Sequence, residues 1–172
     1  MKVQSDPREL ARAAVLADYR PANDAIAIVK EKHSGKDAVF AVAFEDRDGV
    51  PRRGLIGMCR HHGDIKNWRP SGAFMGSARL TDERDVWMTW GGWGPPGSPE
   101  RAVFGGWVAD PAAASARAID NAGRTLHDDV KDGVALFMHK GPFLLMQAQL
   151  ELLDAQGRVL RTGPMRRERR VE

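Results

Sequence analysis

One short segment of the chain carries several side chains that could bind a metal ion: Cys59, His61, His62 and Asp64. Zinc or copper is bound when three or four thiolate or imidazole groups converge on one point. Adjacent residues of an extended chain point to opposite sides, so only one of the two histidines would join Cys59 without a sharp turn. The segment is therefore a candidate metal site. The alternative is that Cys59 is a small core residue and the histidines lie on a surface loop.

Cys59 and His61 also have the residue types of a nucleophile and its base. Such pairs normally come from separate elements, and reactive atoms two positions apart on a strand rarely align. The chain holds no Gly-x-Ser-x-Gly elbow, no phosphate-binding glycine loop before Lys-Ser or Lys-Thr, and no dinucleotide-binding fingerprint between a strand and a helix. We expect no catalytic residues and no cofactor, with a metal-dependent enzyme that uses zinc or copper as the alternative.

Four tryptophans lie in or beside a glycine- and proline-rich part of the chain: Trp87, Trp90, Trp93 and Trp107. Exposed aromatic rings on a β-protein stack on sugar rings or on an extended peptide. On an extended chain Trp87 and Trp93 share one face and Trp90 lies on the other. The favoured interpretation is that the rings fill a core otherwise made of alanines. The surrounding glycines leave room for a shallow aromatic groove, and this groove is the candidate site for a protein, peptide or glycan ligand.

The elements that must position these residues are marked by three turn sequences of one pattern. An aspartate stands first and a glycine fourth in 46–49, 120–123 and 154–157. The aspartate can accept a hydrogen bond from the backbone two residues on, and the glycine can take the positive φ that closes a hairpin. Apolar and polar residues alternate beside these turns, as in strands. The pattern predicts antiparallel β-structure built from hairpins.

Local patterns also predict the individual elements. A capping aspartate, a proline and a glutamate begin a short helix over residues 6–20. Its predicted apolar stripe is Leu10, Ala13, Ala14 and Ala17. Strands are expected near 26–28, 39–44, 55–59, 86–93, 102–108, 114–119, 134–139, 148–152 and 159–160, with 60–99 the least regular part. Gly105 and Gly106 inside an expected strand indicate a bulge or a close crossing.

These elements predict an all-β fold, an antiparallel two-sheet sandwich with one short N-terminal helix. The three turns are unequally spaced, which argues against a propeller or a solenoid. The length of 172 residues fits one domain, which we place at 1–165. Residues 166–172 read as a basic disordered tail, because they hold Arg166, Arg167, Arg169 and Arg170.

Charge and cysteine content bound the partners and the compartment. Lysine and arginine number 26 against 23 acidic residues, and the tail supplies much of that small excess. A short basic run at the end of a chain is more often a solvated tail than a binding surface, so we expect no nucleic-acid interface. The tail could still bind another anionic partner. The single cysteine excludes an intrachain disulfide. We expect no membrane span and no export signal, with a place in the cell envelope only if a signal was trimmed.

The stretch Ala114 to Leu160 resembles a known kind of domain. The resemblance rests on the turn sequences 120–124, 130–133 and 153–158 and on the apolar residues between them. It is similar to immunoglobulin-like β-sandwich domains of uncharacterised bacterial envelope or exported proteins, over about a quarter of the chain. The resemblance implies an immunoglobulin-like fold and an envelope setting. It implies no catalytic residue, because the matching residues are turn and core residues.

The function predicted from the sequence is a non-catalytic binding or scaffolding module that uses the Trp/Gly-rich region. A metal-binding protein or metal-dependent enzyme centred on Cys59, His61 and His62 is one alternative. Binding of an anionic partner through the arginine-rich tail is the other. The sequence does not indicate the oligomeric state.

Overall fold

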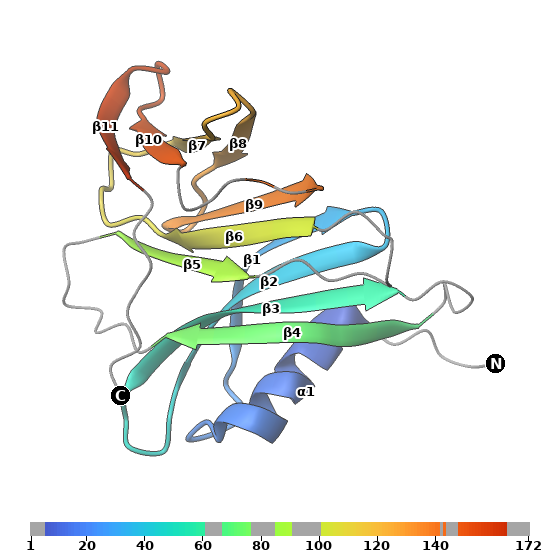
Figure 1. Cartoon of the computed structure of the whole chain (residues 1–172). Helices are drawn as coiled ribbons and strands as arrows, with labels where there is room; N and C mark the ends of the chain where they lie inside the picture. Colours follow the sequence, from blue (N-terminus) through green and yellow to red (C-terminus); the bar gives the residue numbers. More distant parts are fainter. Residues whose placement is uncertain are drawn as a thin grey trace. The chain divides into compact units, whose positions relative to one another are not determined.

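The computed structural model of the chain describes residues 6–60, 67–76, 85–90, 101–141, 143 and 148–164. Within these residues the chain forms one helix and eleven strands, and all paired strands are antiparallel (Figure 1). The predicted antiparallel β-protein with one N-terminal helix is confirmed. The strands form three sheets, however, where two were expected.

The Cα positions cluster in two compact units, residues 1–80 with 170–172 and residues 81–169. The prediction of one domain over 1–165 stays a prediction. The tail at 166–172 lies outside the described residues.

The first unit is a helix on a four-stranded antiparallel sheet. Its elements are α1 (Pro7–Tyr19), β1 (Ala27–Ser34), β2 (Asp37–Glu45), β3 (Pro51–Arg60) and β4 (Trp68–Gly76), with the strands in the order β1-β2-β3-β4. The carboxylate of Asp6 accepts a hydrogen bond from Arg8 N at 2.9 Å, so the helix begins with the predicted cap. It ends at Arg20, which takes a left-handed φ of 46°. Strand β4 was not predicted individually, since 60–99 lacks regular alternation.

Helix α1 packs on one face of this sheet, through a stripe that shares Leu10 and Ala14 with the predicted one. Ala11 and Val15 are fully buried against a cluster that includes Phe40, Val42 and Ile56. Ala13 and Ala17, which were expected in the stripe, are exposed. The stripe is centred on Ala11 and Val15 because the branched Val15 buries more apolar area than an alanine does. Within the described residues, no helix has the length and apolar character needed to cross a membrane.

The second unit holds two sheets. Its strands are β5 (Val86–Trp90), β6 (Arg101–Trp107), β7 (Ser115–Ile119), β8 (Thr125–Asp129), β9 (Val134–Lys140), β10 (Gln149–Leu153) and β11 (Val159–Pro164). The sheet orders are β5-β6-β9 and β11-β10-β7-β8. Strand β8 was not predicted, because its sequence Thr-Leu-His-Asp-Asp is mostly polar. It is a strand because it pairs with β7 along its whole length.

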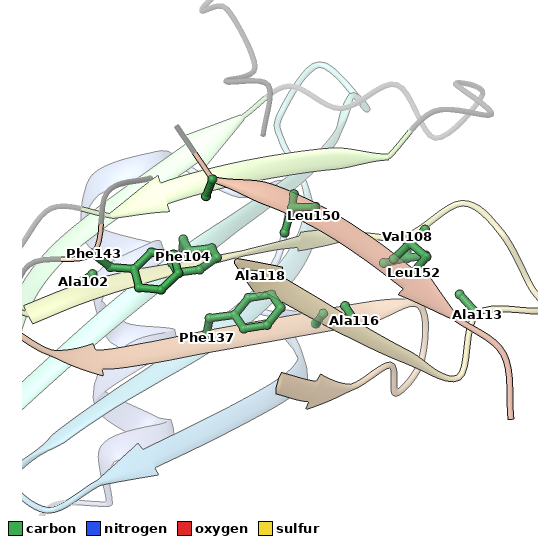
Figure 2. Packing of buried hydrophobic residues seen from close by; sticks show 12 residues of the cluster. Ala102, Phe104, Val108, Ala113, Ala116, Ala118, Phe137, Phe143, Leu150 and Leu152 are labelled. Atoms are coloured by element: carbon green, nitrogen blue, oxygen red, sulfur yellow. The ribbon is translucent and has the colours of Figure 1, made fainter. Parts of the chain in front are cut away.

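The two sheets of the second unit share one core. Phe104 of β6 stacks on Phe137 of β9, with ring centroids 4.7 Å apart, and on Phe143 at 5.6 Å. Figure 2 shows these rings together with small residues of β7, among them Ala116 and Ala118. Large rings from one sheet thus pack against alanines of the other, which lets the sheets approach closely.

The three predicted turns have one geometry. In each, an aspartate oxygen accepts hydrogen bonds from the backbone N–H groups two and four residues on, at 2.9 to 3.0 Å. The glycines take φ between +72° and +77°. The second carboxylate oxygen accepts a hydrogen bond from an arginine at or just before the start of the returning strand. The pairs are Asp46 with Arg52, Asp120 with Arg124, and Asp154 with Arg158. These arginine contacts were not predicted.

We expect the turns to make the protein acid-sensitive. The backbone N–H of Val50 lowers the pKa of Asp46, and that of Arg158 lowers the pKa of Asp154, with the paired arginines adding to both shifts. Because the folded-state pKa lies below the unfolded one, this stabilisation is complete above about pH 4 and is lost as the pH falls through the lowered values. Denaturant unfolding of the wild type should show this loss. Asp46→Asn and Asp154→Asn should each make stability less pH-dependent, whereas an unchanged pH profile in both variants would contradict the assignment.

Candidate functional site

The first candidate, around Cys59, is described only in part. Cys59 is buried in β3, where its cross-strand neighbours are Asp37 of β2 and Arg69 of β4. The other predicted metal ligands, His61, His62 and Asp64, lie outside the described residues. In the described ranges, no group of three or more His, Cys, Asp and Glu side chains is arranged to hold a metal ion. The metal site stays a prediction.

The second candidate, the tryptophan set, is also only partly described. Strand register places Trp87 opposite Gly106 and Trp90 opposite Val103. Trp107 is buried. The side chains of Trp87 and Trp90 and all of Trp93 fall outside the description. Trp107 thus occupies a core position, and the aromatic groove stays a prediction.

A third surface, which the sequence analysis did not single out, lies on β11. Among the described residues, the exposed large apolar side chains are Leu16, Val159 and Leu160. Val159 and Leu160 are adjacent in the chain and are 48% and 39% exposed. Strand β11 lies at one edge of its sheet, and among the described residues it pairs with β10 alone. We call Arg158, Val159 and Leu160 the β11 surface.

The β11 surface contains a β-bulge. Leu153 of β10 pairs with Val159, whereas the preceding Leu152 pairs with Arg161, so Leu160 is the extra residue. A bulge, a charged residue and a proline are features that prevent an edge strand from pairing with another chain, and β11 has all three, ending at Pro164. A partner would therefore contact this surface through side chains and not by adding a strand.

Both ends of the β11 surface are fixed by ion pairs. Arg158 donates to Asp154 at 2.7 Å and is still 77% exposed, because it lies on the outside of the turn. Arg161 pairs with Asp85, whose other oxygen accepts a hydrogen bond from Ala109 N at 2.9 Å. The apolar pair is thus presented on a backbone held at two points, with exposed positive charge beside it.

A sequence signal for this surface does exist. In residues 157–161, Gly-Arg-Val-Leu-Arg, the apolar residues Val159 and Leu160 are adjacent just after a turn. Strict alternation of apolar and polar residues would make one of them polar. Adjacent apolar residues break the period of two, as a bulge does. The sequence analysis assigns both residues to the returning strand, and both lie in β11.

Comparisons with protein-family models, with characterised proteins and with solved structures find no match to this chain.

Proposed function

We propose that the chain is a non-catalytic binding module and that the β11 surface contacts a protein partner. The observation that carries the proposal is the exposure of the adjacent residues Val159 and Leu160 on a braced edge strand. Because both side chains are already partly buried, covering the rest against a partner would contribute roughly 1 kcal/mol each. The Trp/Gly-rich region, which the sequence analysis favoured, remains a further proposed surface of the same module.

Two features favour an acidic partner: the exposed Arg158 of the β11 surface, and a sequence after β11 in which arginines outnumber glutamates. Arg158 is exposed beside the apolar pair, and the sequence after β11 places four arginines and two glutamates in residues 166–172. Two copies of this surface would bring like charges together, which disfavours self-association. The proposed partner is therefore a protein segment with acidic groups around apolar side chains.

We also propose an immunoglobulin-like sandwich for the second unit. Two antiparallel sheets enclosing one core, with hairpins at 120–123 and 154–157, support this. An experimental structure in which β5-β6-β9 and β11-β10-β7-β8 do not face each other would reject it.

We expect the double variant Val159→Ser/Leu160→Ser to lose binding to an acidic, apolar probe. A fluorescent peptide of alternating glutamate and leucine serves as the probe, and fluorescence anisotropy reports binding. The variant should bind at least about tenfold more weakly, because the buried apolar area is lost. Leu16→Ser is the matched control, since Leu16 is 46% exposed on α1 and lies outside the β11 surface.

Several outcomes would reject the β11 surface as the binding site. One is equal binding of the peptide by the wild type and the double variant. Another is a loss of binding in Leu16→Ser as large as that in the double variant. The third is tighter binding of the wild type to the matching lysine–leucine peptide than to the glutamate–leucine peptide. A dimer in analytical ultracentrifugation that the double variant abolishes would assign the surface to a second copy. Stoichiometric zinc or copper in the purified protein, lost in Cys59→Ser, would favour the metal-binding alternative instead.

A further inference from the structure

A cluster of charged and aromatic side chains lies on the first unit. Its members are Glu31 and His33 of β1, Phe40 of β2, Arg60 of β3 and Trp68 of β4, and we call it the His33 cluster. The imidazole of His33 meets Phe40 and Trp68 edge to face, with ring centroids 5.7 and 6.0 Å apart. Arg60 and Trp68 are cross-strand partners. Four strands therefore bring these residues to one end of the sheet.

The guanidinium of Arg60 has hydrogen-bonding capacity that the described residues do not use. Its Cζ lies 4.2 Å from the centroid of the Trp68 ring, a cation–π contact. Its Nε is enclosed and finds no acceptor within the described part of the chain. Buried donors are nearly always satisfied in folded proteins, by protein, water or a ligand. Arg60 is thus placed and oriented, with a donor that lacks an acceptor among the residues that the structure describes.

The nearby acidic group is already neutralised. Arg8 of α1 donates to both carboxylate oxygens of Glu31, at 2.6 and 2.8 Å, and these bonds are the main cause of its lowered pKa. His33 Nε2 lies 3.5 Å from Glu31, and its side chain is 44% exposed. Asp37 pairs with Cys59, the residue next to Arg60 on β3. Because adjacent residues of a strand point to opposite faces, Asp37 and Cys59 lie on the face of the sheet opposite to Arg60. The positive charge of Arg60 therefore has no anionic partner on the face that carries His33, within the described residues.

We infer that Arg60 and His33 form a binding site for a small oxyanion, a phosphate or a carboxylate group, beside the ring of Trp68. A guanidinium recognises both groups through two parallel N–H donors. His33 adds a second donor at the exposed side. The backbone N–H of Arg60 donates to the carbonyl of Lys36 at 2.8 Å, which fixes the end of β3 next to the β1–β2 turn.

The test follows the Nε–H signal of Arg60 by ¹⁵N NMR in the full-length protein. Sodium phosphate and sodium acetate are titrated separately, at an ionic strength held constant with chloride. We expect a saturable shift of this signal and of the His33 ring signals. Saturation by phosphate alone identifies a phosphorylated ligand, and saturation by acetate alone or by both salts identifies a carboxylate-bearing one. No saturable shift with either salt would overturn the inference.

Variants separate the site from general charge effects. Arg60→Gln should weaken anion binding by about tenfold or more, the equivalent of a lost charge-assisted hydrogen bond. Arg69→Gln is the matched control, because Arg69 follows Trp68 on β4 and therefore lies on the opposite face of the sheet. It removes the same charge and should change the affinity for the anion by less than about twofold. An equal loss in both variants would overturn the inference. If Arg60→Gln does not fold, His33→Gln at the half-exposed position serves instead and should weaken binding several-fold.

Discussion

Replacing Gly105 with alanine is expected to lower the free energy of unfolding by about 3 kcal/mol. A Cβ atom at this position would lie 2.6 Å from the backbone oxygen of Ala135 and 2.6 Å from Leu136 Cδ2. A side chain could rotate away, but the backbone oxygen belongs to β9, which pairs with β6 along its whole length. The strand pair would have to separate locally, so the cost is large.

Gly163→Ala is the matched control for this prediction. Gly163 also lies in a strand, β11, but nothing lies within 4 Å of a Cβ placed there. Alanine is favoured over glycine within a strand, so stability should stay the same or rise slightly. Urea unfolding measures both variants. If Gly105→Ala were as stable as Gly163→Ala, the close approach of β6 and β9 would be wrong.

Asp120→Ala is expected to cost about 2 to 3 kcal/mol in unfolding free energy. The carboxylate of Asp120 is fully buried and accepts hydrogen bonds from Ala122 N and Arg124 N at 2.9 Å and from Arg124 Nε at 2.6 Å. Removing it leaves these donors without their acceptor at the β7–β8 turn. Chemical denaturation followed by circular dichroism measures the loss.

Two comparisons test the cause of this loss. Asp120→Asn keeps an amide oxygen for the backbone donors but loses the ionic contact with Arg124, so it should be less destabilising than alanine. Asp154→Ala removes the same contacts at a turn whose aspartate is more exposed, and it should also cost less. Equal losses for Asp120→Ala and Asp154→Ala would show that burial does not set the strength of the turn.

Local chemistry accounts for what was predicted correctly. The aspartate–glycine turns and the capped start of α1 depend on hydrogen bonds within a few residues, so the residue types alone specify them. The failures lie where the partner is remote in the sequence. Strand β8 is polar and forms because β7 pairs with it. The buried side of α1 was predicted only in part, because alanines mark both sides of the helix: Leu10 and Ala14 pack on the core, whereas Ala13 and Ala17 are exposed.

The candidate sites divide in the same way. Residue type alone made the cysteine, the histidines and the tryptophans candidates for a site. Whether a side chain can bind a partner depends on its exposure, and exposure is set by the neighbouring strands. Trp107 is buried, whereas Val159 and Leu160 are exposed. The bulge that exposes Leu160 follows from the pairing of β10 with β11.

The sequence by itself determined the class of this protein, its three hairpin turns and the start of its helix, because each depends on a few adjacent residues. Only the tertiary structure decided which side chains meet. His33, Arg60 and Trp68 come from three strands, and their contact depends on the register between those strands. Register is set by the packing of a whole face of the sheet, which no short segment encodes.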